Sequence, residues 1–176
     1  EEYPGSVVDV SQLQFMLGKA KGYGYRTVVL QSGEDPRFTP DVLCPALERI
    51  HAMDLAITLS LGERSYEEYR AFREAGADRY LLRIETSNPA LYRTLHPADH
   101  SWERRRDCLR TIGRLGYQLG SGVMIGLPGQ TADDLASDLE FFRDEGIDMI
   151  GMGPFLPHSQ TPLGSVAVAR ARQLEL

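Results

Sequence analysis

Two side chains of opposite charge, Arg83 and Glu85, stand two residues apart in a stretch that otherwise has the composition of a buried strand. Side chains alternate across a strand, so Arg79, Arg83 and Glu85 should share one face. Burying a charge is costly unless a partner or a ligand pairs with it. Two interpretations stay open: these groups pair with other charges of the protein, or they bind a zwitterionic ligand.

The elements that must position these side chains follow a regular alternation. Five short β-rich runs alternate with amphipathic helical stretches, the pattern of parallel strands joined by crossover helices. The expected strands are 27–31, 56–61, 80–85, 119–125 and 149–153. Helix starts are predicted at Thr39-Pro40, Ser65 with Glu68, Asn88-Pro89, Ser101 and Thr131 with Asp134, and left-handed helix ends at Gly76, Gly116 and Gly146. The stripes 43, 47, 50 and 135, 139, 142 are predicted to be core.

The open doubly wound sheet and the closed β/α barrel both fit this alternation. No GxGxxG follows the first strand, and each strand ends in a different polar or glycine-rich sequence. Ligand binding shared across the carboxyl ends of several strands is typical of a barrel. We therefore predict an α/β fold in which residues 1–176 form a single domain, the central part of a TIM-type (β/α) barrel with about five parallel strands and outer helices. A complete barrel typically needs about 250 residues.

Composition narrows the class of ligand. The chain has 176 residues and a formal net charge of -6, which argues against a general binder of nucleic acid or of anionic membranes. No apolar run approaches the length of a membrane helix, so a small ligand and a cytoplasmic setting are expected. Cys44 and Cys108 lie far apart and form no zinc or CxxC spacing, so no metal ligand is predicted, and Cys108 is expected to be a core residue.

Candidate ligand-binding residues lie where the expected strands end. In the turn Ser32-Gly33-Glu34, the carboxylate can accept hydrogen bonds from an ammonium group. Thr58 and Ser60 should point into the barrel, and they are either ligand contacts or small space fillers. Further along the chain, one strand face carries Gly122, Met124 and Gly126, which is either core packing or a flat apolar shelf suited to an aromatic ring.

The order of these motifs resembles a known family. The segments SGEDP, TLSLGE, RYLLRIETSNP, SGVMIGLPGQT and GMGPFLPHSQTPL, between about residues 25 and 164, resemble the radical S-adenosylmethionine (radical SAM) superfamily. Within it they are most similar to the HydE-type maturases of iron-only hydrogenase, which are related to biotin synthase and methylornithine synthase. The resemblance implies S-adenosylmethionine and a [4Fe-4S] cluster as cofactors, 5′-deoxyadenosyl radical chemistry on a small substrate, a role in assembling the hydrogenase di-iron site, and other hydrogenase maturation proteins as candidate partners.

The resemblance also implies roles for individual residues, although it names no catalytic residue. Glu34, with Ser32 and Gly33, would bind the methionyl ammonium group, Glu85 the methionyl or ribose part, Arg105 the carboxylate, and the strand face of Gly122, Met124 and Gly126 the adenine. Arg79 and Arg83 would bind carboxylates of the substrate, helped by Thr58, Ser60 and Thr161. An arginine fork suits a carboxylate geometrically. The alternative is a solvated arginine run, which we prefer for Arg104 and Arg106.

One feature departs from the family. The CxxxCxxC loop that supplies three thiolates to the cluster does not occur in this sequence. We expect the chain to be a fragment that lacks the first strand, the cluster loop and the last strands, and to be inactive alone. The alternatives are another radical SAM enzyme of the biotin synthase and methylornithine synthase group, or a cluster-free module that binds S-adenosylmethionine or an amino acid.

Overall fold

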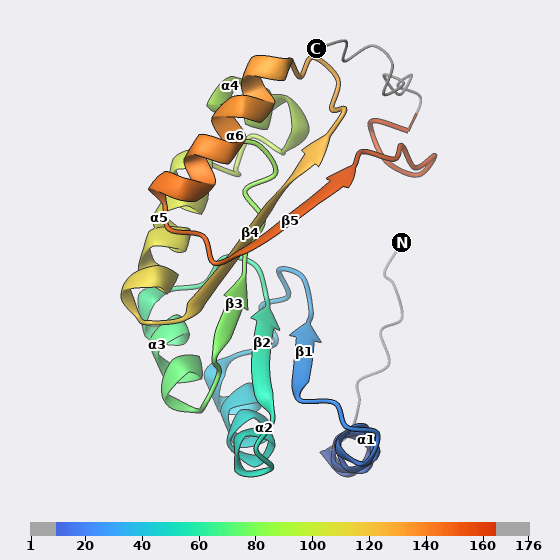
Figure 1. Cartoon of the computed structure of the whole chain (residues 1–176), viewed down its shortest axis with the longest axis vertical. Coiled ribbons are helices and arrows are strands. Elements are labelled where there is room, and N and C mark those ends of the chain that lie inside the picture. The colour runs from blue at the N-terminus through green and yellow to red at the C-terminus, as the bar shows by residue number, and fades with distance from the viewer. Residues whose placement is uncertain (1–9, 165–176) are drawn as a thin grey trace.

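A computed structural model of the chain describes the backbone of residues 10–164 and the side chains of residues 15–164 (Figure 1). The strands are β1 (Thr27–Gln31), β2 (Ala56–Ser60), β3 (Arg79–Leu81), β4 (Gln118–Ile125) and β5 (Met149–Pro154). The helices are α1 (Val10–Gly22), α2 (Pro40–Ala52), α3 (Tyr66–Glu74), α4 (Pro89–Leu95), α5 (Trp102–Arg114) and α6 (Ala132–Asp144).

The strands form one parallel sheet whose spatial order is the order of the sequence, β1-β2-β3-β4-β5. A doubly wound sheet reverses its order at a switch point, and this sheet does not. Helices α3, α5 and α6 lie along the same side of the sheet (Figure 1), as right-handed crossovers to successive neighbours require. The predicted partial β/α barrel is confirmed.

Strand β3 is shorter than predicted, and its backbone turns to a left-handed conformation at Glu85. The regular ladder ends at Leu81, and Glu85 has a φ of 66°, a left-handed conformation that is costly for a residue with a Cβ. Pairing with β4 nevertheless continues, since the amide of Glu85 donates to the carbonyl of Gly122 at 3.0 Å. The strained residue is thus held in place by the neighbouring strand.

The predicted helix starts and ends are confirmed in their chemistry. Ser65 with Glu68, and Thr131 with Asp134, form complete capping boxes, and the Asn88 and Ser101 side chains accept hydrogen bonds from the first turns of α4 and α5. Thr39 makes no side-chain cap, but Pro40 begins α2 as predicted. The three glycines predicted at helix ends, Gly76, Gly116 and Gly146, have positive φ values.

The core lies between the sheet and the helices. Ile57 and Leu59 of β2 and Phe72 of α3 are fully buried, and Cys108 packs in the same core as predicted. The stripe predicted on the last helix is wrong for Leu139, which is 56% exposed. Helix α6 instead turns Asp138, Phe141 and Phe142 inward, because its buried face also carries a polar contact to a loop.

Within the described residues, no helix is long and apolar enough to span a membrane.

Helices α5 and α6 are cross-linked through Glu145, which follows the end of α6. Its side chain is 5% exposed, and it accepts hydrogen bonds from Arg106 at 2.6 Å and from Arg110 at 2.8 Å. Burial alone would raise the pKa of Glu145, but the hydrogen bonds from Arg110 and Arg106 outweigh it and hold the pKa below its usual range. The two helices are therefore held together by an ion pair that strengthens the fold above the ordinary glutamate pKa.

The substitution Glu145→Gln should lower the free energy of unfolding of the full-length protein by about 1.5–3 kcal/mol, the range for a hydrogen bond to a charged group. Chemical denaturation at pH 7 measures it. Glu140→Gln is the matched control, because Glu140 is an exposed glutamate within α6. This substitution should lower the free energy of unfolding by less than about 0.5 kcal/mol. An equal loss of unfolding free energy in the two variants would contradict the role of Glu145 in linking α5 and α6.

Candidate cofactor-binding site

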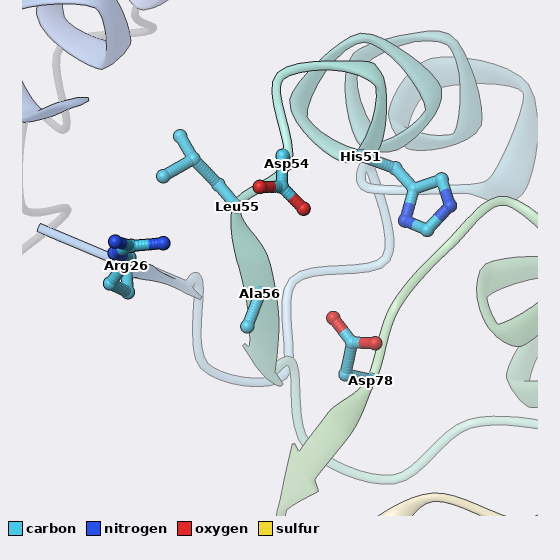
Figure 2. A pocket seen from close by; sticks show the side chains of 6 residues that line it. All are labelled: Arg26, His51, Asp54, Leu55, Ala56 and Asp78. Atoms are coloured by element: carbon cyan, nitrogen blue, oxygen red, sulfur yellow. The ribbon is translucent and has the colours of Figure 1, made fainter.

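A cavity of about 260 Å³ lies at the amino ends of β1, β2 and β3 (Figure 2). The residues that line it are Arg26, His51, Asp54, Leu55, Ala56 and Asp78. The Asp78 carboxylate is already occupied, since it accepts a hydrogen bond from the amide of Ile57 at 2.8 Å. Ligands of parallel β/α folds bind at the opposite, carboxyl ends of the strands. We therefore assign this cavity no role in ligand binding.

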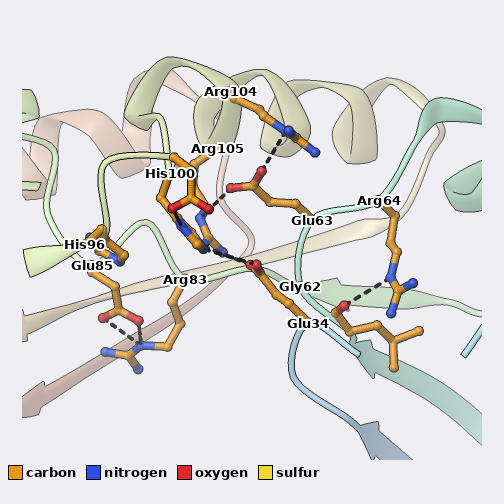
Figure 3. Close-up of polar contacts among 12 residues, drawn as sticks. Glu34, Gly62, Glu63, Arg64, Arg83, Glu85, His96, His100, Arg104 and Arg105 are labelled. Atoms are coloured by element: carbon orange, nitrogen blue, oxygen red, sulfur yellow. Dashed lines mark hydrogen bonds and ion pairs between the residues drawn. The ribbon is translucent and has the colours of Figure 1, made fainter. Parts of the chain in front are cut away.

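The carboxyl ends of β1 and β2 hold a cluster of ion pairs around Arg105 (Figure 3). Glu34 from the loop after β1 lies 3.0 Å from Nη2 of Arg105, and Glu63 from the loop after β2 lies 3.0 Å from its Nε. Arg104 contacts the other oxygen of Glu63 at 2.9 Å, but its side chain is 69% exposed. Of the run 104–106, the structure brings Arg105 into the rim and leaves Arg104 in solvent, as predicted. The prediction of a solvated side chain is wrong for Arg106, because it pairs with the buried Glu145 at 2.6 Å.

Arg105 carries its charge although it is 9% exposed. Burial alone would lower its pKa, but the hydrogen bond to Tyr92 and the charges of Glu63 and Glu34 outweigh burial and raise the pKa. Nε of Arg105 donates to Oη of Tyr92 at 3.3 Å. Burial in turn raises the pKa of Tyr92, which keeps its hydroxyl protonated. The rim thus contains a permanent, well-supported positive charge.

The backbone beneath this cluster is fixed by buried side chains. Gly62 has a φ of 75°, and a Cβ there would collide with the side chain of Glu34. The hydroxyl of Tyr80 donates to the Gly62 carbonyl at 3.0 Å, and Arg64 ties the two loops together by donating to the Asp35 carbonyl at 2.6 Å. The carboxylates of Glu34 and Glu63 therefore project from loops that are braced against each other.

Aromatic rings continue the rim on the side of α4. Tyr92 and His96 are stacked with ring centroids 3.8 Å apart, and His100 is the next ring at 6.2 Å from His96. Nε2 of His100 lies 3.4 Å from Glu34, and its Nδ1 lies 3.1 Å from Asp99. Glu34 is thus flanked by a guanidinium and an imidazole while its side chain stays 40% exposed.

Arg83 and Glu85 form a second, separate group (Figure 3). Nε of Arg83 lies 3.2 Å from both carboxylate oxygens of Glu85, and its Nη2 donates to the Val123 carbonyl at 2.8 Å. The guanidinium passes over two glycines: a Cβ at Gly122 would lie 3.1 Å from its Nη1, and one at Gly151 3.4 Å. The two residues pair with each other, and they remain partly exposed toward the inner face of the sheet.

The other predicted cofactor residues lie near these groups or beside them. The Ser32 hydroxyl donates to the Gly33 carbonyl at 2.9 Å, and its amide to the Ser60 carbonyl at 3.2 Å, so the turn before Glu34 is ordered by β2. Gly126 has a φ of 86°, and its amide donates to Gln130 at 2.7 Å. Met124 packs on a small apolar cluster. The predicted adenine shelf is therefore partly taken by Arg83, which lies over Gly122.

The predicted substrate residues are not all brought together. Thr58 is 7% exposed and is paired in register with Arg79. The guanidinium of Arg79 contacts Gln118 at 2.5 Å and Thr27 at 3.3 Å, toward the amino ends of the strands. Arg79 and Arg83 are four residues apart, which on a strand is a separation of about 13 Å. One small substrate would therefore have to extend along the strands, from their amino ends toward their carboxyl ends, to meet both arginines.

Thr161 lies outside these groups. Its hydroxyl donates to the His158 carbonyl at 2.8 Å within an exposed turn after β5, and Ser60 stands at the end of β2 in register with Gln31. Neither residue has a side-chain hydrogen bond to Arg83 in the part of the chain that the structure describes. Their assignment to the substrate stays a prediction.

The loop after Glu85 is anchored to α5 and α6. Trp102 donates to the Thr86 carbonyl at 3.1 Å, and the amide of Ser87 donates to Asp138 at 2.6 Å. The side-chain amide of Asn88 donates to Asp134 at 2.7 Å. Asp138 is fully buried, and desolvation raises its pKa, while the hydrogen bonds of Asn88 and Thr131 lower that of Asp134. These contacts hold the strained Glu85 in position.

Comparison with known proteins agrees with this geometry. The sequence model of the radical SAM superfamily matches residues 2–142. The chain belongs to the radical SAM superfamily. It is 54% identical over 143 residues to the [FeFe] hydrogenase maturase subunit HydE of Thermotoga maritima, a match that covers 81% of this chain and 41% of that protein. The chain thus spans about two fifths of this relative.

Other relatives share the scaffold. A biotin synthase of Hydrogenobaculum sp. is 31% identical over 135 residues, which cover 73% of this chain and 39% of that enzyme. The crystal structure of methylornithine synthase superposes with a TM-score of 0.83 at 24% identity, over 92% of this chain and 48% of that one. That identity supports a shared fold and no more.

The cofactors of this family are S-adenosylmethionine and a [4Fe-4S] cluster. The Glu34 and Arg105 pair fits the amino-acid part of the former, because it offers one acceptor for an ammonium group and one fork for a carboxylate. The chain offers no fit for the cluster: its two cysteines are Cys44, on α2, and Cys108, in the core, and the described residues contain no group of three or more potential metal ligands.

Three rim residues were missed by the sequence analysis: Glu63, Tyr92 and His100. Glu63 ends the segment TLSLGE, just after a predicted strand. Because the carboxyl ends of parallel strands meet at one rim, its place beside Glu34 could have been predicted. Tyr92 lies in α4, and His100 lies just before the start of α5. Their nearness to Glu34 depends on packing between elements that are distant in sequence. No spacing signals such contacts.

The substitution Asp138→Asn should increase the thermal stability of the full-length protein more at pH 7 than at pH 4. A raised aspartate pKa means that the native state favours the proton, so this stabilisation is complete below the ordinary pKa of 3.8 and is lost as the pH rises through the native value. Asparagine imitates the protonated form at every pH. Thermal unfolding measured across this pH range tests it.

Asp134→Asn is the matched control with the opposite sign. The pKa of Asp134 is lowered, so its ionised carboxylate stabilises the fold at pH values above the ordinary aspartate pKa of 3.8. The variant should therefore be less stable than the wild type at pH 7, and the difference should shrink as the pH falls. Parallel pH profiles for the two variants would contradict the assignment of the two carboxyl groups.

Proposed function

We propose that the full-length protein is a radical SAM enzyme of the HydE maturase type, which helps to assemble the di-iron site of [FeFe] hydrogenase by acting on a small substrate. The observation that carries the cofactor part is the Glu34 and Arg105 pair at the carboxyl rim. The 54% identity to HydE supports the maturase part. Other hydrogenase maturation proteins would then be its partners.

The pair can exchange its internal contact for a ligand. Glu34 and Arg105 present opposite charges 3.0 Å apart, and the ammonium and carboxylate of an α-amino acid have the complementary arrangement. The ammonium group would bind Glu34, and the carboxylate would take the Nη edge of Arg105. Both charges of the protein stay paired before and after binding, so the exchange avoids an unpaired buried guanidinium.

When bound to the full-length protein, S-adenosylmethionine and the [4Fe-4S] cluster of this family would supply radical chemistry for the substrate. The residues of this chain would bind and orient the cofactor and the substrate, and they would exclude water from both. Arg83 and Glu85 face the inner side of the sheet, where Arg83 offers a cation to a substrate carboxylate. Glu85 would contact the methionyl or ribose part, with Ser32 and Gly33 in the turn before Glu34. The face of Gly122, Met124 and Gly126 would support adenine.

The second candidate is another enzyme on the same scaffold. The 31% identity to a biotin synthase supports a member of the biotin synthase and methylornithine synthase group, and the fold shared with methylornithine synthase is compatible with it. Substrates distinguish the two candidates, since the amino-acid site of the cofactor would be common to both.

The substitution Arg105→Ala should weaken the binding of S-adenosylmethionine to the full-length protein by about 1.5–3 kcal/mol, the range for a hydrogen bond to a charged group. Equilibrium dialysis on the protein with its cluster oxidised, so that no turnover occurs, measures the affinity. Arg106→Ala is the matched control, because Arg106 pairs with Glu145 on the far side of α5. An unchanged affinity in folded Arg105→Ala protein would refute the cofactor site.

The full-length protein, reconstituted without oxygen, should give an electron paramagnetic resonance spectrum of a reduced [4Fe-4S] cluster that changes when S-adenosylmethionine is added. The change is expected because a cofactor bound beside the cluster would alter the cluster's surroundings, on which its electronic properties depend. A folded full-length protein without a cluster signal would refute the enzyme and favour a cluster-free binding module.

A further inference from the structure

Glu63 is a buried carboxylate that the proposed function does not use. Its side chain is 9% exposed, and it lies in the loop between β2 and α3. One carboxylate oxygen, Oε1, lies 3.0 Å from Nε of Arg105 and has no well-aligned hydrogen bond within residues 15–164. A buried carboxylate is costly unless it compensates a positive charge. Of the two arginines that contact Glu63 within the described residues, Arg104 is exposed and Arg105 is itself buried.

The loop fixes Glu63 independently of Arg105. The carbonyl of the preceding Gly62 accepts the hydroxyl of Tyr80 at 3.0 Å, and the following Arg64 donates to the carbonyls of Leu61 and Asp35. Glu34, by contrast, is 40% exposed. Of the two carboxylates that pair with Arg105, that of Glu63 is therefore held by the core, and that of Glu34 can move away.

The two glutamates contact different edges of the guanidinium. Glu63 lies at Nε, at 3.0 Å, whereas Glu34 lies at Nη2, at 3.0 Å (Figure 3). The Tyr92 hydroxyl also lies at Nε, at 3.3 Å. A ligand carboxylate that replaced Glu34 would bind the Nη edge and leave the contacts at Nε in place. The orientation of Arg105 is therefore set from the side that faces away from the ligand.

We propose that Glu63 is a positioning residue for Arg105, and this inference rests on the proposed function. It compensates the buried charge of Arg105 while Glu34 turns to the ammonium group of S-adenosylmethionine, and it keeps the Nη edge directed at the carboxylate. Without its charge, Arg105 depends on Glu34, so the internal pair closes and competes with the amino-acid part of the cofactor. Ligands without that part are unaffected.

The test compares two ligands on the full-length protein with an oxidised cluster. In Glu63→Gln, S-adenosylmethionine should bind roughly tenfold more weakly, the effect of one charge-assisted contact. 5′-Methylthioadenosine, which has the adenosine and the sulfur but no amino-acid group, should change by less than about twofold. Glu63→Asp, which keeps the charge, should recover part of the lost affinity. Equilibrium dialysis measures both ligands, and circular dichroism verifies the fold.

Arg104→Gln is the matched control, because Arg104 contacts the other oxygen of Glu63 from solvent and is not directed at the site. It should leave both affinities within about twofold. The proposal is overturned if Glu63→Gln binds S-adenosylmethionine like the wild type, or if it loses both ligands equally. If Arg105→Ala also binds normally, the proposed function fails; if only Arg105→Ala is impaired, the positioning role alone fails.

Discussion

The buried charge of Arg105 is the constraint on which the arrangement of the rim depends. Helix α5 brings a guanidinium to a place where 9% of the residue is exposed, and such a charge needs counter-charges that are already in position. The loops after β1 and β2 each supply one carboxylate. Three elements that are distant in sequence are thereby required to meet at one point, and that point is the carboxyl end of the sheet.

The two carboxylates differ in how firmly they are held, and this difference gives the cluster its capacity to bind. The β2 loop is braced by Tyr80 and Arg64, whereas Glu34 remains partly exposed beside His100. A site made only of fixed ion pairs would compete with its ligand, and a site made only of mobile charges would lose the orientation that affinity needs. Pairing one fixed and one exposed glutamate with the same arginine meets both requirements.

The sequence predicted the scaffold well because local chemistry determines it. The capping boxes at Ser65 and Thr131 depend on residues three positions apart, and the structure contains both. Arg105 was selected through the family resemblance, but it also shares a helix face with Cys108 and Ile112, both buried. Burial of an arginine on an apolar stripe is a signal that periodicity can detect.

The remaining features depend on distance in space. Alternation placed Arg79 and Arg83 on one face correctly, but it could not show that Arg79 turns toward Gln118, or that Glu85 leaves the regular ladder. Leu139 was assigned to the core because leucine spacing alone does not reveal that Asp138 occupies the inward face. Contacts of Glu63 with two arginines of α5 likewise arise only when the barrel brings the loop and the helix together.

Glycines at the rim provide space for charged side chains as well as for ligands. Gly62 lets the side chain of Glu34 pass, and Gly122 leaves room for the Gly151 carbonyl of the neighbouring strand and for the guanidinium of Arg83. A glycine-rich strand end is therefore ambiguous evidence for a ligand shelf, because the protein itself can fill the space. At Gly122 the two roles compete: a Cβ there would lie 3.1 Å from Nη1 of Arg83, so the arginine already occupies part of the strand face that the resemblance assigns to adenine.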